Sequence, residues 1–138
     1  MENPSAFPIG EPNDGFAQYF VGQSYLASVL NTPEFSIHNV TFEPGCRNNW
    51  HIHHGGAQVL IAVGGRGYYQ IEGQEPKELK AGEAVCIPAE TKHWHGAAPG
   101  ESFSHLAFMV PAGDPDTMSN EWLEPVTDEE YNKLEQAK

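Results

Sequence analysis

The sequence has few cysteines, few basic residues and no long apolar run. Its two cysteines, Cys46 and Cys86, are too few for the disulfide framework that stabilises many small secreted domains. No apolar run approaches the roughly 20 residues that a membrane-spanning helix needs. The first 16 residues lack both the basic and the apolar region of a secretory signal. We therefore expect a soluble, cytoplasmic protein without a membrane partner.

Basic residues are scarce relative to acidic ones. The chain carries 7 Lys and Arg against 19 Asp and Glu, which gives a formal net charge of -12. Nucleic-acid binding requires clustered cations that replace the counterions of phosphate, and this composition argues against it. The length of 138 residues suits one domain.

Short apolar segments with β-branched and aromatic residues follow one another between Gly and Pro. Such segments predict strands over residues 35–43, 57–63, 68–72, 83–87, 93–98 and 102–110. Many short strands at this spacing are typical of a β-sandwich or barrel, so we predict an all-β fold. Residues 1–18 are expected to form an N-terminal arm, followed by a short apolar piece over residues 19–30, and the barrel core covers about residues 35–110.

The strand pattern ends after Pro111, and residues 111–138 are expected to form a tail with a short helix. Thr127 and Glu130 have the spacing of a capping box, which would begin a helix reaching about Gln136. All 138 residues are assigned to a single domain.

Seven histidines carry the strongest chemical signal, because four of them form two His-x-His pairs. The pairs are His51 with His53 and His93 with His95. Residues two apart in a strand face the same side, so each pair can direct both rings into one space. Several imidazoles in an apolar interior would lack partners, and a divalent metal ion resolves that conflict. His38 and His105 belong to other alternating segments that could face the same interior, whereas His54 should lie at the surface.

Residues 45–65 resemble the first cupin motif: Gly, five residues, His-x-His, three or four residues, Glu, six residues, Gly. Gln58 stands in place of the usual Glu. Residues 82–93 resemble the second motif: Gly, five residues, Pro-x-Gly, two residues, His. Here Glu90 replaces the second Gly, and Ala97 follows where Asn is usual. The chain is thus similar to small single-domain cupins, including the cupin-type hydroxynitrile lyases and the carboxymuconolactone-decarboxylase-associated cupins.

This resemblance implies a cupin barrel, a jelly-roll-like double-stranded β-helix, with one divalent ion of manganese, zinc, iron or nickel. The implied ligands are His51, His53, Gln58 and His93. Because all four are neutral, the ion would keep its full charge and act as a strong Lewis acid. His95, His105 and His38 are the candidates for general acid or base.

The pattern leaves several functions open. We expect a metal-dependent lyase or isomerase, decarboxylase-like or hydroxynitrile-lyase-like, that acts on a small carbonyl or hydroxy compound. The alternatives are an iron- or nickel-dependent dioxygenase and a non-catalytic small-molecule-binding cupin.

Barrels of this size commonly cover their strand edges with a second copy, so we expect a homodimer or higher homo-oligomer.

Aromatic residues are a second candidate feature of the site, because they could line a pocket for a ring-bearing substrate. Those considered are Trp50, Tyr68, Tyr69, Trp94, Phe103 and Phe108. Trp94 lies between His93 and His95, so it should point away from the face that these two histidines share.

Overall fold

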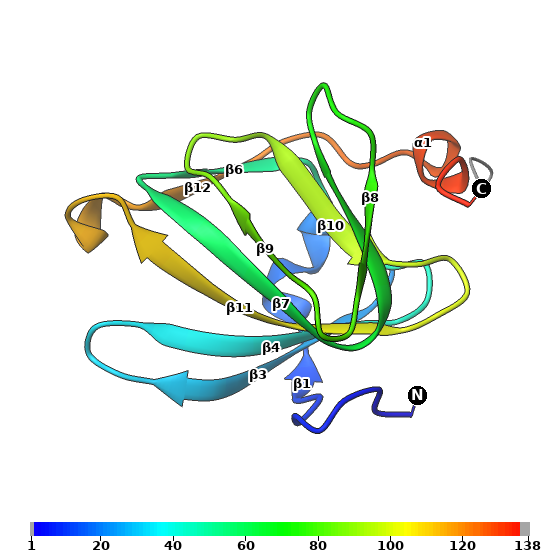
Figure 1. The fold of residues 1–138 in the computed structure, drawn as a ribbon, viewed down its shortest axis with the longest axis horizontal. Coiled ribbons are helices and arrows are strands. Elements are labelled where there is room, and N and C mark those ends of the chain that lie inside the picture. Colours follow the sequence, from blue (N-terminus) through cyan, green and yellow to red (C-terminus); the bar gives the residue numbers. More distant parts are fainter. Residues whose placement is uncertain (1, 136–138) are drawn as a thin grey trace.

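A computed structural model describes residues 2–135 of the chain and shows an all-β fold with one short α-helix (Figure 1). The N-terminal half contains β1 (Glu11–Pro12), the 3-10 helix η1 (Asp14–Tyr19), β2 (Phe20–Val21), β3 (Ser24–Asn31), β4 (Ser36–Phe42), β5 (Arg47–Asn48), β6 (His51–His54) and β7 (Gly56–Ile71). The C-terminal half contains β8 (Lys77–Lys80), β9 (Ala84–Ile87), β10 (His93–Ala97), β11 (Phe103–Pro111), the 3-10 helix η2 (Pro115–Thr117), β12 (Ser119–Trp122) and α1 (Asp128–Asn132). None of the helices in the described residues is long and apolar enough to cross a membrane.

Two curled antiparallel sheets share strand β7 and form the barrel. The first sheet runs in the order β1, β3, β4, β11 and the first half of β7, with β9 on the other side of β7. The second sheet contains β2, β5, β10 and the second half of β7, with β6, β8 and β12 paired to them. Figure 1 shows the barrel interior between these sheets, with α1 far from the hairpin of β3 and β4.

The prediction of two strands over residues 57–63 and 68–72 was wrong, because β7 is one continuous strand. Glycines in its middle let it bend from one sheet to the other instead of ending it. Gly65 has a φ of +69°, and a Cβ at Gly67 would lie 2.4 Å from the Phe103 ring. Absence of a side chain therefore permits both the bend and the close packing.

Other expectations also needed correction at the ends of the chain. The strand pattern does not stop at Pro111, because β12 pairs with β6 along its whole length. The apolar piece over residues 19–30 forms β2 and most of β3. Part of the N-terminal arm is regular too, since β1 pairs with β3.

The capping box at Thr127 was predicted correctly. The Thr127 side chain accepts the Glu130 backbone N–H, and the Glu130 carboxylate accepts the Thr127 N–H in return. The helix ends at Asn132, and the predicted end at Gln136 lies outside the described residues.

Two apolar clusters pack on opposite sides of the second sheet. Inside the barrel, Phe42, Leu60 and Phe103 are fully buried together. Outside it, Trp50 and Trp94 pack beneath α1 against Tyr131. Trp94 therefore points away from the barrel interior, as the alternation predicts, and its indole N–H donates to Gln70.

Candidate metal centre

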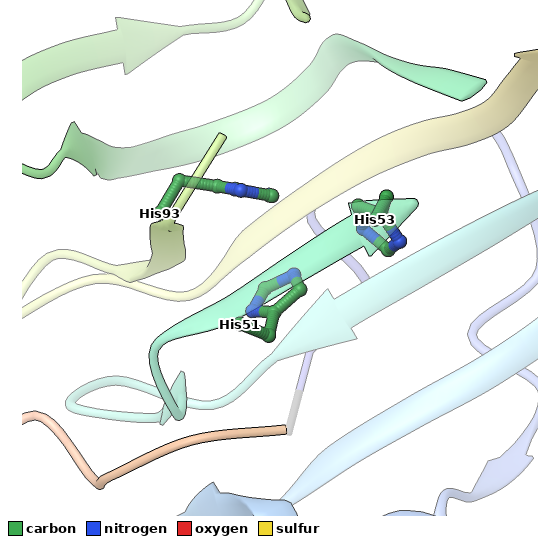
Figure 2. Close-up of side chains that lie close together, drawn as sticks. All are labelled: His51, His53 and His93. Atoms are coloured by element: carbon green, nitrogen blue, oxygen red, sulfur yellow. The ribbon is translucent and has the colours of Figure 1, made fainter. Parts of the chain in front are cut away.

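Three histidines converge inside the barrel from two neighbouring strands. His51 and His53 project from β6, and His93 projects from β10, where it pairs in register with His51 (Figure 2). One ring nitrogen of each lies within 4.8 Å of those of the other two. All three side chains are buried, with residue exposures of 1%, 7% and 0%. The structure thus brings these three predicted ligands to one point.

The outer nitrogen of each ring is held by a hydrogen bond. His51 Nδ1 lies 2.8 Å from the Asn49 carbonyl, and His93 Nδ1 lies 2.9 Å from the Thr91 carbonyl. His53 Nδ1 lies 2.7 Å from Asn120 Oδ1. Each Nδ1–H donates to an oxygen, so the neutral ring presents the lone pair of its Nε2 inward. Such outer hydrogen bonds orient metal-binding histidines.

Gln58 places its amide oxygen among these lone pairs. Gln58 Oε1 lies 3.0 Å from His53 Nε2 and 3.3 Å from His93 Nε2. Because the Nδ1 atoms of His53 and His93 carry the ring protons, their Nε2 lone pairs face the Gln58 oxygen, which is also an acceptor. A cation between these three atoms would relieve the repulsion. Three imidazole nitrogens and one amide oxygen form a donor set that first-row divalent ions accept. The residues therefore fit the ion implied by the cupin motifs.

Burial keeps these rings neutral. It lowers the pKa of His93 to about 4 and that of His53 below the ordinary value. Burial, followed by repulsion from His93 and His53, lowers the pKa of His51 well below the ordinary value. Neutral imidazole is the form that binds metal, so no proton has to be removed near neutral pH.

His95 and His105 lie in the same interior. Their ring centroids are 5.0 Å apart, and that of His95 is 5.9 Å from that of His93. Asn48 orients His95, because its Oδ1 accepts the His95 backbone N–H at 2.9 Å and its Nδ2 lies 3.1 Å from His95 Nε2. The structure places His95 beside the three converging rings rather than among them.

His105 carries an unpaired nitrogen. Its Nδ1 lies 3.2 Å from the Leu106 carbonyl, whereas its Nε2 is buried with no hydrogen-bond partner in the described part of the chain. Burial lowers the pKa of His105 to about 4, so the ring is neutral. A buried, unsatisfied lone pair costs free energy unless a ligand satisfies it. His38 is half-buried on β4 and lines a cavity in the same barrel interior.

A cavity of about 320 Å³ opens onto these side chains. Its lining consists of Asn13, Phe16, Phe20, Leu26, His38, Val40, Phe42, Asn48, His51, His53, Gln58, His95, His105, Ala107, Asn120 and Trp122. No Lys, Arg, Asp or Glu is among these described lining residues. A second cavity of about 330 Å³ adjoins the first and shares His38, His53 and Gln58 with it.

The aromatic wall of the first cavity differs from the predicted one. None of the six aromatic residues considered from the sequence lines it, although Phe108 lines the adjoining cavity. The aromatic side chains that line it are Phe16, Phe20, Phe42 and Trp122. The Trp122 ring centroid lies 4.7 Å from that of His51. Residues 111–138 carried no strand signal that could have placed Trp122 against β6.

The surface position of His54 matches its prediction. Its side chain is 38% exposed and contacts Glu90 on one side and Glu121 on the other, at 2.8 Å. Glu90 has a φ of +61°, which explains why the second motif usually has Gly there. The Glu90 carboxylate accepts the Gly55 N–H at 2.9 Å, a contact that offsets part of the backbone strain.

Comparison with known proteins agrees with this architecture. The fold and the converging histidines define a small β-barrel with the features of a metal centre, and the family model "Cupin domain" matches residues 38–111. The chain belongs to the cupin family. A curated relative, an (R)-mandelonitrile lyase from Granulicella tundricola, is 38% identical over 122 residues, covering 86% of this chain and 90% of that protein.

Solved structures show the same barrel. A cupin-like protein from Thermotoga maritima has a TM-score of 0.85 and 34% identity, with 97% of this chain and 99% of that chain covered. A predicted oxalate decarboxylase from Thermotoga maritima has a TM-score of 0.67 at 17% identity, with 80% and 99% covered. The second likeness shows the fold alone.

Proposed function

We propose that this protein is a metal-dependent lyase that cleaves a small, neutral α-hydroxy compound, with hydroxynitrile-lyase chemistry as the best match. The observation that carries the proposal is the unpaired His105 Nε2 in an uncharged, aromatic-walled cavity that also opens onto His51 and His53. The relative named (R)-mandelonitrile lyase supports the same class.

In this proposal His51, His53, Gln58 and His93 hold the divalent ion. When bound, the ion supplies a Lewis acid that stabilises negative charge developing on a substrate oxygen. The four residues add no negative charge of their own, so the positive field in the cavity is uncompensated. Asn49, Thr91 and Asn120 keep the rings oriented through their Nδ1 atoms.

His105 is the proton acceptor in the cleavage direction. Its Nε2 takes the hydroxyl proton of the substrate, the electrons of that O–H bond form the carbonyl, and the bond from carbon to the leaving group breaks. The leaving group, cyanide for a hydroxynitrile, departs with the bonding electron pair and receives the proton that His105 Nε2 took up, which leaves the ring neutral again. His95 packs against the His105 ring and lines the same cavity.

The cavity wall favours a neutral, ring-bearing substrate. Phe16, Phe20 and Trp122 offer apolar surface, and no described lining residue is a cation that could pair with a carboxylate or phosphate. Apart from the ion itself, the described wall offers no cationic group for the carboxylate of a decarboxylase substrate, whereas a hydroxynitrile needs none.

Release of aldehyde and cyanide from an aromatic cyanohydrin tests the proposal. Protein reconstituted separately with manganese, zinc, iron and nickel should release both products in equal amounts, and protein treated with a chelator should not. His105→Gln should lower the rate by about 100-fold or more while metal content stays unchanged. Equal rates for this variant and the parent would remove His105 from the mechanism.

Two other outcomes would point to the alternative functions. Consumption of O2 with an oxidised product, dependent on iron or nickel, would support a dioxygenase. Metal-dependent stability without turnover of hydroxynitriles, of carboxylate substrates or of O2 would support a binding protein. In that last case His105→Gln would alter ligand affinity alone.

A further inference from the structure

The two cavities of the barrel meet beside the converging histidines. Their volumes are about 320 and 330 Å³, so each is large enough for a small ligand. The residues that line both are His38, His53, Gln58, Ala107 and Asn120. His53 and Gln58 therefore face either cavity, whereas His105 lines the first of these two and not the second. A molecule held at His53 and Gln58 can thus extend in two directions.

Strand β11 leads from one cavity to the other along its inward side. His105, Ala107 and Met109 follow one another on this side, because every second residue of a strand points the same way. His105 lines the first cavity, Met109 lines the second, and Ala107 lies between them and lines both. Neighbours in such a row are about 7 Å apart, at about 3.4 Å per residue. The methyl group of Ala107 is the smallest side chain of the three, so it leaves room between the other two.

The wall of the second cavity is apolar and held in place by local contacts. Phe35, Met109 and Met118 contribute much of its apolar surface. An added Cβ at Gly56 would lie 2.6 Å from the Met118 sulfur, so the missing side chain lets Met118 pack against β7. The Thr32 hydroxyl accepts the Phe35 N–H at 3.0 Å and fixes the tip of the β3–β4 hairpin. Figure 1 shows this tip and η2, which precedes Met118, at the same end of the barrel.

Charge and size restrict what the second cavity can hold. Glu34 is the one acidic residue among its described lining residues, which include no Lys or Arg, and it is exposed at the hairpin tip. A carboxylate at the rim repels anionic groups and leaves the apolar wall to an uncharged one. A leaving group of two heavy atoms, such as cyanide, is far smaller than a cavity of about 330 Å³. The expected occupant is therefore an apolar group larger than the leaving group.

We propose that the second cavity is a substrate subsite, and that the reacting carbon carries two apolar groups, one for each cavity. This inference rests on the proposed lyase function and narrows its substrate, because the carbonyl product is then a ketone rather than an aldehyde. A ring lies against the aromatic wall of the first cavity, and a chain on the same carbon passes Ala107 toward Met109. A hydroxynitrile derived from an aldehyde buries less apolar surface and should bind more weakly.

Two isomeric alcohols that cannot be cleaved test the assignment without requiring turnover. 1-Phenyl-1-pentanol carries a ring and a four-carbon chain on its carbinol carbon, whereas 4-butylbenzyl alcohol carries the same chain at the far end of the ring. The isomers have the same atoms and similar apolar surface, so non-specific contacts affect both equally. Isothermal titration calorimetry of protein reconstituted with redox-inactive zinc should give one enantiomer of 1-phenyl-1-pentanol a Kd at least about tenfold lower than that of 4-butylbenzyl alcohol.

Two side chains of the same hairpin provide a matched pair of truncations. Phe35 and Leu30 are 45% and 46% exposed, and of these two Phe35 lines the second cavity. Phe35→Ala should reduce the preference for 1-phenyl-1-pentanol by about fivefold, whereas Leu30→Ala should leave it unchanged. Met109→Trp places a larger side chain in the path of the chain and should abolish the preference. Elemental analysis should show the same zinc content in all three variants.

Two binding results would overturn the subsite. Equal affinities for the isomers in the parent protein, or tighter binding of 4-butylbenzyl alcohol, would show that the reacting carbon places no group in the second cavity. A preference that survives both Phe35→Ala and Met109→Trp would locate the chain elsewhere.

Turnover separates this inference from the lyase proposal. Cleavage of the hydroxynitriles of benzaldehyde and of 1-phenylpentan-1-one gives the second test, and the latter should have the higher kcat/KM. If neither is cleaved but the isomer preference holds and responds to Phe35→Ala, the lyase proposal fails and the subsite stands as a binding site. If both are cleaved while the isomers bind equally, the lyase proposal stands and the subsite fails.

Discussion

Acidification should destabilise the metal-free protein through its buried histidines, and His93 and His105 allow the effect to be worked out. Both residues are fully buried, and burial lowers both pKa values from the usual 6.5 to about 4. In the unfolded chain each ring takes up a proton near pH 6.5, whereas in the folded chain it resists protonation until about pH 4. The unfolded state therefore binds more protons throughout this window, and stability falls as the pH falls.

The magnitude follows from proton linkage. Between pH 8 and pH 5, one group with these two pKa values lowers the free energy of unfolding by about 2 kcal/mol. His93 and His105 together should therefore remove about 4 kcal/mol, a large part of the roughly 5–15 kcal/mol that a domain typically has. The lowered pKa values of His51 and His95 add to the loss. The raised pKa of the exposed His54, bound to Glu121 and Glu90, acts in the opposite direction.

Urea unfolding in a chelating buffer at pH 8, 7, 6 and 5 measures this dependence. The free energy of unfolding should stay nearly constant above pH 7 and then fall steeply. His105→Leu serves as the control, because removing one titrating ring should reduce the pH 8 to pH 5 difference by about 2 kcal/mol, whatever its effect on absolute stability. A parent protein whose stability changes by less than about 1 kcal/mol over this range would refute the reasoning.

Four further substitutions test the site, its supports and the final helix. Gln58→Glu should retain the metal but weaken inhibition by small anions at least tenfold. The reason is that a charge about 4 Å away is worth about 4 kcal/mol at an effective dielectric constant near 20. Unchanged inhibition constants would contradict the charge argument. Asn120→Ala frees His53 Nδ1 and should lower metal affinity by about 10-fold to 100-fold in competition with a chelator, while equal affinity would assign Asn120 no orienting role. Replacing His93 by Ala should reduce bound metal to a small fraction of one equivalent by elemental analysis, and full retention would remove it from the ligand set. Thr127→Ala removes the cap of α1 and should cost about 1 kcal/mol in urea unfolding, whereas no change would mean that α1 contributes little to stability.

The spacing of the histidines was enough to predict much of the site. A period of two along a strand places His51 and His53 on one face, and it directs Trp94 away from the face of His93. The second cupin motif likewise marked a position that favours Gly, where the structure has Glu90 at a positive φ. These are local properties, set by backbone geometry and by the residue type at each position.

The supports of the site could not be predicted in the same way. Asn120 reaches His53 from β12, and Asn48 reaches His95 from β5, so each contact joins segments far apart in the chain. Trp122 lines the cavity for the same reason. No spacing rule connects such residues, because their proximity depends on which strands pair and in what register.

By itself, the sequence determined the all-β class, the two histidine pairs and the cap of the final helix, because each depends on residues within a few positions of one another. Only the tertiary structure decided that β7 continues through its glycines into both sheets and that His105 Nε2 has no hydrogen-bond partner among the described residues. It also decided that Asn39 of β4 donates to the Pro8 carbonyl of the N-terminal arm. Those outcomes depend on how the curled sheets close on each other, and closure is set by long-range packing and register rather than by local preference.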